Sequence, residues 1–286
     1  MLISITYSLL FITIITLWLP SNSRIKIWQV TAFLALSFAY LSNLITEIGI
    51  LVIGVYGILC ILYAKNEVIK RHLLLLPVLV MGGIIAKHFL PGFNNLLILS
   101  NFQFTADALP FTLYLNIDKA FSGILLAGFV LQLSFKKMDW IIIGKALKSK
   151  LPIVLITVLG ISYLLGYVKF SPKLPDYFLI WMVSNLLITC LAEEALFRGI
   201  LQNHLSQLTY RYSSVVAILI PALIFGALHY SGGIKYVALT SIAGLLYGWI
   251  YNASGKRIEA SILAHFAVNL LHILFFTYPA LRSAFN

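Results

Sequence analysis

Long apolar runs separated by short polar segments account for most of the chain. A helix that crosses a bilayer needs about 20 predominantly apolar residues, and ten runs reach or approach that length. The candidate spans are residues 2–19, 28–46, 48–64, 73–90, 119–135, 151–168, 177–199, 214–230, 235–252 and 259–277. The pattern therefore predicts an all-α fold, a polytopic integral membrane helix bundle with about 8–10 transmembrane helices.

Two polar connections predict further elements. Residues 91–118, the longest segment without a helical pattern, are expected to form a folded loop or a re-entrant lid. Residues 136–150 contain five lysines and Trp140, which is typical of an amphipathic helix lying on an anionic leaflet. This basic segment marks the expected boundary between N-terminal transmembrane helices, residues 1–150, and a second transmembrane domain, residues 151–286.

The composition agrees with a membrane protein. The chain is 61% hydrophobic and 10% charged, whereas a soluble domain has about 25% charged residues. The net charge of +11 does not indicate a nucleic-acid partner, because the lysines and arginines lie mostly between apolar runs, where they set topology. Their distribution places both termini outside if ten spans are present.

Cys60 and Cys190 lie inside apolar runs, and we expect buried thiols rather than a disulfide.

Three ionisable residues follow the uncharged segment 177–191: Glu193, Glu194 and Arg198. The insertion of each charged side chain into a bilayer costs roughly 3 kcal/mol of free energy. Three such residues close together therefore indicate a functional site. Glu194 and Arg198 are four residues apart, so on a helix they share a face and can pair, either within a site or as a structural ion pair. Glu193 points elsewhere, so it is expected to lack this partner and to have no cation beside it. A buried carboxylate without an adjacent cation suits general acid–base chemistry.

Two more polar groups interrupt the C-terminal apolar runs. His229 ends the eighth run, four residues after Phe225, and His265 shares a helix face with Asn269 in the tenth. Lipid would not tolerate these groups, so they are expected inside the bundle, as a site or as hydrogen-bond partners between helices. With a turn near residues 210–212, Glu193 and His229 would lie at matching depth on antiparallel helices.

At these residues the chain resembles the CPBP family. That family includes the type II CAAX prenyl endopeptidases, bacterial abortive-infection and bacteriocin-processing proteins, and related intramembrane glutamic proteases. The resemblance covers about residues 176–277, and an N-terminal segment is similar to one in some prokaryotic members. The matching motifs are Glu193-Glu194-x-x-x-Arg198, Phe225-x-x-x-His229 and His265-x-x-x-Asn269, and the N-terminal segment is Asn116-x-Asp118-Lys119.

The resemblance implies an intramembrane endopeptidase of the glutamic type, with residues 151–286 as its catalytic domain. Glu193 would activate the attacking water and His229 would share or relay its proton. His265 and Asn269 would donate hydrogen bonds to the oxyanion. The other two motif residues, Glu194 and Arg198, would hold the site together or contact substrate.

The resemblance also sets expectations for the surroundings of this site. No cofactor and no metal ion are expected. The expected partner is a membrane-anchored peptide or protein, CAAX-like or with a C-terminal sorting tail. The protein is expected to span the lipid bilayer several times, in a prokaryotic cell (inner) membrane.

Other functions fit the sequence less well. Glu193, His229 and His265 would suit a zinc protease, but no His-Glu-x-x-His motif occurs. Ser254 lies in a basic turn, which disfavours a serine protease, and the Gly-x-Gly-Asp motif of aspartyl types is missing. A proton-coupled transporter would use a Glu/His relay, yet the paired half-helices of transporters are not evident. A bacteriocin-immunity or scaffold protein would gain nothing from these polar residues.

Overall fold

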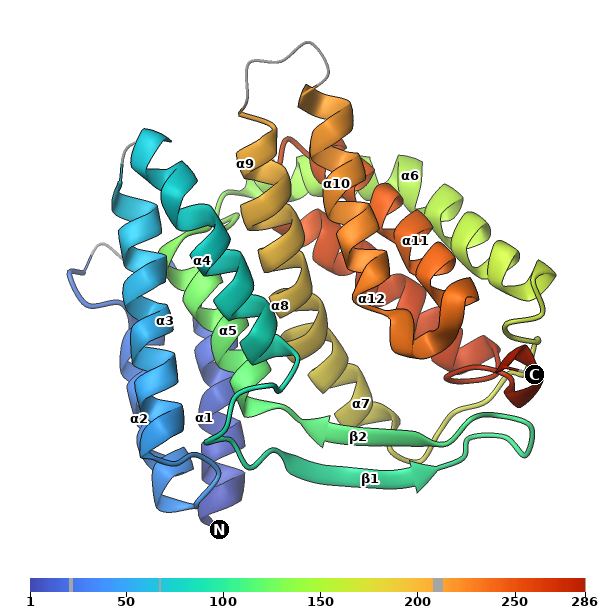
Figure 1. The fold of residues 1–286 in the computed structure, drawn as a ribbon, viewed down its shortest axis with the longest axis horizontal. Helices are drawn as coiled ribbons and strands as arrows, with labels where there is room; N and C mark the ends of the chain where they lie inside the picture. Colours follow the sequence, from blue (N-terminus) through green and yellow to red (C-terminus); the bar gives the residue numbers. More distant parts are fainter. Residues whose placement is uncertain (21–22, 67, 208–212, 286) are drawn as a thin grey trace. The chain divides into compact units, whose positions relative to one another are not determined.

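The structure, a computed structural model, describes residues 1–20, 23–66, 68–207 and 213–285. Most of it is helical, and Figure 1 shows the elements in chain order. The first half contains α1 (Leu2–Thr16), α2 (Ile27–Leu41), α3 (Glu47–Lys65), α4 (Val68–Ala86), β1 (Leu96–Phe102), β2 (Phe111–Leu115), α5 (Ile117–Phe129) and α6 (Lys137–Leu164). The second half contains α7 (Phe178–Ser184), η1 (Asn185–Cys190), α8 (Leu191–Glu194), η2 (Ala195–Gln202), α9 (Asn203–Leu205), α10 (Ser213–Ala227), η3 (Tyr230–Gly232), α11 (Gly233–Ala253), α12 (Ile258–Phe275) and η4 (Arg282–Phe285).

Several of these helices suit a bilayer. Among the described residues, four are long and apolar enough to cross a membrane: Glu47–Lys65, Phe178–Leu205, Tyr230–Ala253 and Ile258–Phe275. Shorter apolar helices occupy Leu2–Thr16, Ile27–Leu41, Arg71–Ala86 and Ser214–Ala227. The predicted polytopic helical membrane bundle is therefore confirmed. The turn predicted near residues 210–212 lies outside the described residues.

The chain folds as two compact units. Unit 1 comprises Met1–Leu96, Leu115–Lys136 and Leu187–Leu196. In this unit α1 lies against α2, and α3 lies against α4 and α5 (Figure 1). The helices α5 and α8 approach closely at Gly123, where an added Cβ would lie 3.1 Å from the Cα of Ala192. Small residues allow such close helix packing in membranes, and this contact brings the start of α5 near the glutamates of α8.

Unit 2 comprises Leu97–Tyr114, Lys137–Leu186 and Phe197–Asn286. Here α10 packs on α11, and α6 packs on both α11 and α12. The helix α6 covers residues 137–150 of the basic segment and residues 151–164 of the sixth apolar run, so no break separates the two at residue 150. Where α6, α11 and α12 meet, the buried side chains are mostly small or branched and apolar, together with one tyrosine. They include Val154, Val158, Ala243, Tyr247, Ile250, Ala260 and Ala264.

The sequence analysis expected residues 91–118 to form either a folded loop or a re-entrant lid, and the structure shows a folded segment. Its strands β1 and β2 pair in a two-stranded sheet. Beyond the strands, the rings of Phe104 and Phe111 lie 5.4 and 5.1 Å from the ring of Tyr278. Trp181 of α7 donates a hydrogen bond from Nε1 to the Tyr278 hydroxyl at 3.1 Å. The hairpin is therefore attached to the start of α7 and to the chain after α12.

Candidate active site

Both candidate glutamates lie on α8, within the continuous helix Phe178–Leu205. The turns before and after α8, η1 and η2, are wide π-helical turns, which are rare and frequently occur at functional sites. Glu194 is fully buried, and the Glu193 side chain is 16% exposed. The expected Glu194–Arg198 pair lies where α8 passes into η2, and the pairing stays a prediction.

The carboxylate of Glu193 has a cation beside it. In unit 1 the Nζ of Lys119 donates to Oε1 of Glu193 at 2.7 Å, and the Lys119 side chain is only 12% exposed. The expectation that Glu193 lacks an ionic partner was therefore wrong. Its partner comes from α5, 74 residues earlier in the chain, and a search for partners within one helix could not find it.

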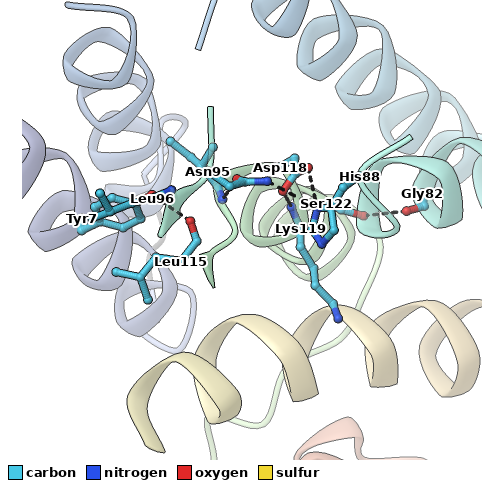
Figure 2. A network of polar contacts seen from close by, with 10 residues as sticks. Tyr7, Gly82, His88, Asn95, Leu96, Leu115, Asp118, Lys119 and Ser122 are labelled. Atoms are coloured by element: carbon cyan, nitrogen blue, oxygen red, sulfur yellow. Dashed lines mark hydrogen bonds and ion pairs between the residues drawn. The ribbon is translucent and has the colours of Figure 1, made fainter. Parts of the chain in front are cut away.

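The first turn of α5 holds Lys119 through its neighbours, as Figure 2 shows. Asp118 is buried, and its Oδ1 accepts a hydrogen bond from the backbone N–H of Lys119 at 2.8 Å. Its Oδ2 accepts one from Nδ1 of His88 at 2.7 Å. Asn95 accepts one from the N–H of Ile117 at 2.8 Å. Asp118 therefore lies at a helix N-terminus and satisfies one of its orphan N–H groups.

A second lysine lies in the same region of unit 1. Lys87 follows the end of α4, and burial lowers the pKa of its ammonium group, while the charge of Glu193 acts in the opposite direction and the charge of Lys119 adds to the lowering. Lys87 is therefore close enough to Glu193 for their charges to interact. The surroundings of Glu193 therefore include cationic side chains from two segments of unit 1.

In unit 2, Arg198 is completely buried among aromatic rings and a backbone carbonyl. Its Nη2 donates to the carbonyl oxygen of Gly244 at 2.9 Å. The guanidinium carbon lies 5.1 Å from the ring centroid of Phe225 and 5.4 Å from that of Tyr247. Such distances allow cation–π attraction. Four residues later, Gln202 donates to the Gly248 carbonyl at 2.9 Å, so two side chains of this helix bind the backbone of α11.

The two candidate histidines of unit 2 meet the same aromatic ring. The centroid of Phe225 lies 4.5 Å from the His229 ring and 5.9 Å from the His265 ring. His265 is buried and stacks on Tyr247, with ring centroids 4.8 Å apart. The Nδ1 of His229 donates to the Phe225 carbonyl oxygen at 2.6 Å. Since that bond requires a proton on Nδ1, a neutral His229 keeps Nε2 as its proton acceptor.

Asn269 lies one turn after His265 on α12, and its amide has a partner that the sequence did not predict. Its Nδ2 donates to the Oδ1 of Asn185 at 3.2 Å. Asn185 opens the π-helical turn η1, eight residues before Glu193. An amide nitrogen carries two hydrogens, and this bond uses one of them.

Comparison with known proteins bears on these motifs directly. Residues 175–271 match a family model described as type II CAAX prenyl endopeptidase Rce1-like, and the six candidate residues all fall inside that range. The match covers about a third of the chain, and over that segment the chain is similar to type II CAAX prenyl endopeptidases. Neither the curated proteins nor the solved structures give a match. The Rce1-like match and the apolar helices support an integral membrane endopeptidase of the CAAX type.

Within the Rce1-like segment, the structure of unit 2 brings Arg198, His229 and His265 around Phe225. Glu193 and Glu194 belong to unit 1. That Glu193 and His229 lie at the same depth in the membrane stays a prediction. Among the described residues, no group of three or more His, Cys, Asp or Glu side chains is arranged to hold a metal ion.

Sequence reasoning missed the roles of Lys119, Asn185 and Tyr247. Lys119 carried a signal, since it is a lysine at the start of an apolar run, in a segment similar to family members. Asn185 carried a weaker one, because an amide within an apolar span needs a hydrogen-bond partner. Tyr247 carried none, because an aromatic residue in an apolar run is more often part of a core.

Proposed function

We propose that this protein is a glutamic-type intramembrane endopeptidase. Glu193 acts as the general base that activates a water molecule, and His229 shares or relays the proton. The activated water attacks the carbonyl carbon of a peptide bond, and His265 and Asn269 donate hydrogen bonds to the resulting oxyanion. Preorganised donors of this kind typically contribute about 3–4 kcal/mol each to transition-state stabilisation.

One observation carries the proposal. The ring of Phe225 lies within 6 Å of the Arg198 guanidinium and of both histidine rings. Arg198 lies on η2, His229 lies just after α10, and His265 lies on α12. The arrangement supports a chemical role because it buries Arg198 and His265 beside the half-buried His229. Burying such polar groups in a membrane protein is costly, and helix packing alone does not require it. It also orients His229, whose Nδ1 is bound to the Phe225 carbonyl.

The proposed substrate is a membrane-associated protein with a prenylated C-terminal CAAX sequence. The family implies such a substrate, and a prenyl chain would keep the scissile bond at the membrane, beside helices that are themselves apolar. A protein with an unprenylated C-terminal sorting tail is the alternative substrate. A prokaryotic cell membrane is the proposed location.

The test compares Glu193→Gln with the wild type, because the substitution keeps the side-chain shape and removes the base. Glu47→Gln is the matched control, since Glu47 is exposed at the start of α3. Each purified protein is placed in liposomes with a quenched peptide that ends in a farnesylated cysteine and three further residues. In parallel, mass spectrometry compares membrane peptides from cells that make each variant.

We expect Glu193→Gln to remain folded and to lose cleavage, and Glu47→Gln to keep it. Peptides that accumulate only with active protein identify the substrate class, prenylated or not. Near wild-type cleavage by folded Glu193→Gln protein would contradict the proposal.

A further inference from the structure

The contact between Lys119 and Glu193 joins two segments of unit 1 at the proposed general base. Nζ and Oε1 lie 2.7 Å apart, and both side chains are largely buried. A charge-assisted hydrogen bond of this length is among the stronger polar interactions in proteins. It engages one of the two carboxylate oxygens and so restricts rotation of the carboxylate group.

The position of Lys119 is itself fixed from several directions. Asp118 binds the Lys119 N–H and the His88 ring, and Asn95 binds the N–H of Ile117 (Figure 2). At the other end of the contact, Gly123 allows α5 to lie against α8. The ammonium group is therefore presented to Glu193 by a rigid helix start, which is how a second layer of residues supports a reacting group.

We infer that Lys119 is a positioning residue, which holds the Glu193 carboxylate in the orientation that water activation requires. The inference rests on the proposed function. Misplacing a reacting group by about 1 Å can lower a rate by about 10²-fold, and a glutamate side chain with three rotatable bonds easily moves that far.

Charge compensation alone does not account for this arrangement. Lys87 is a second cation whose charge interacts with Glu193, so removing Lys119 leaves one positive group near the carboxylate. The effect of the direct contact can therefore be measured separately from the effect of nearby positive charge.

The experiment measures kcat, KM and melting temperature for three single variants in liposomes, with the peptide that the wild type cleaves. Lys119→Met removes the ammonium group and keeps the chain length, and Lys119→Arg keeps a cationic donor. Lys148→Met is the control for loss of one positive charge, because Lys148 is exposed on α6. We expect Lys119→Met to lower kcat by about 10- to 100-fold with little change in KM. Lys119→Arg recovers most of this loss, and Lys148→Met behaves as the wild type.

Stability supplies an independent readout. If the two groups pair, Lys119→Met lowers the melting temperature, and adding Glu193→Gln to the same chain restores it, because the carboxylate no longer needs a partner. The inference would be overturned if the double variant is no more stable than Lys119→Met, or if neither of the two variants folds.

Activity supplies the other decisive outcomes. Folded Lys119→Met protein with wild-type kcat would overturn the inference, as would an equal loss of kcat in Lys119→Arg. Failure of the proposed function has a different signature, since Glu193→Gln would then cleave the peptide as the wild type does. If Glu193→Gln is inactive and Lys119→Met is fully active, only the role of Lys119 is wrong.

Discussion

Replacing Asn269 with alanine separates a catalytic role from a structural one. Asn269 donates to Asn185 at 3.2 Å, so it ties α12 to the helix that carries the glutamates. The proposed function gives the same amide a second task, donation to the oxyanion. Asn185→Ala removes the acceptor of this hydrogen bond and leaves the Asn269 amide in place, which makes it the matched control.

The two roles differ in size and in the quantity that they affect. Hydrogen bonds between membrane helices contribute about 0.6 kcal/mol on average and about 1.7 kcal/mol at most, and their loss lowers the free energy of unfolding. Loss of an oxyanion donor lowers kcat by about 10²–10³-fold, or about 3–4 kcal/mol of transition-state stabilisation. KM changes little, because negative charge on the oxygen exists only after attack.

The assay combines melting temperature with single-turnover cleavage for Asn269→Ala, Asn269→Asp and Asn185→Ala. We expect similar, small losses of stability from Asn269→Ala and Asn185→Ala. We expect the large loss of kcat only in the Asn269 variants, since aspartate replaces the donor with an acceptor. Folded Asn269→Ala protein with an unchanged kcat would refute the oxyanion role and leave Asn269 as a tie between helices.

Two further predictions concern packing. Gly123→Ala should lower the free energy of unfolding by about 1–3 kcal/mol, because the new Cβ would lie 3.1 Å from the backbone of Ala192. Gly54→Ala, at an open site on α3, is the control and should cause no loss of stability in the same thermal melts. Arg198→Ala should cost about 3–5 kcal/mol of stability if it leaves the Glu194 carboxylate buried without its partner, and adding Glu194→Gln, which removes that charge, should recover part of the loss. Equal melting temperatures for the single and double variants would mean that Glu194 and Arg198 do not pair.

The helical membrane fold could be predicted from the sequence because hydrophobicity is a local property. Each run of about 20 apolar residues is driven into lipid by its own composition, and a helix satisfies its backbone hydrogen bonds within the run. The candidate site residues were found on the same ground. Polar residues such as Glu193, His229 and His265 lie within apolar runs or at their ends, and the insertion cost of a polar group is visible without any partner.

Some features stay predictions after the structure is known. These are the domain boundary at residue 150, the orientation in the membrane and the chemical roles of the six motif residues. Helix α6 runs without a break through residue 150, so the change from basic segment to apolar run is a change of composition within one helix.

The partners of the polar residues were decided only by tertiary structure. Lys119 and Glu193 are 74 residues apart, and Asn185 and Asn269 are 84 apart. Arg198 donates to the carbonyl of Gly244, 46 residues later, and a backbone carbonyl leaves no trace in the sequence. The hydropathy pattern indicates that a buried polar group needs a partner. Which residue becomes that partner depends on which helix faces pack together. That packing is set by side-chain shape and small residues such as Gly123 across distant segments.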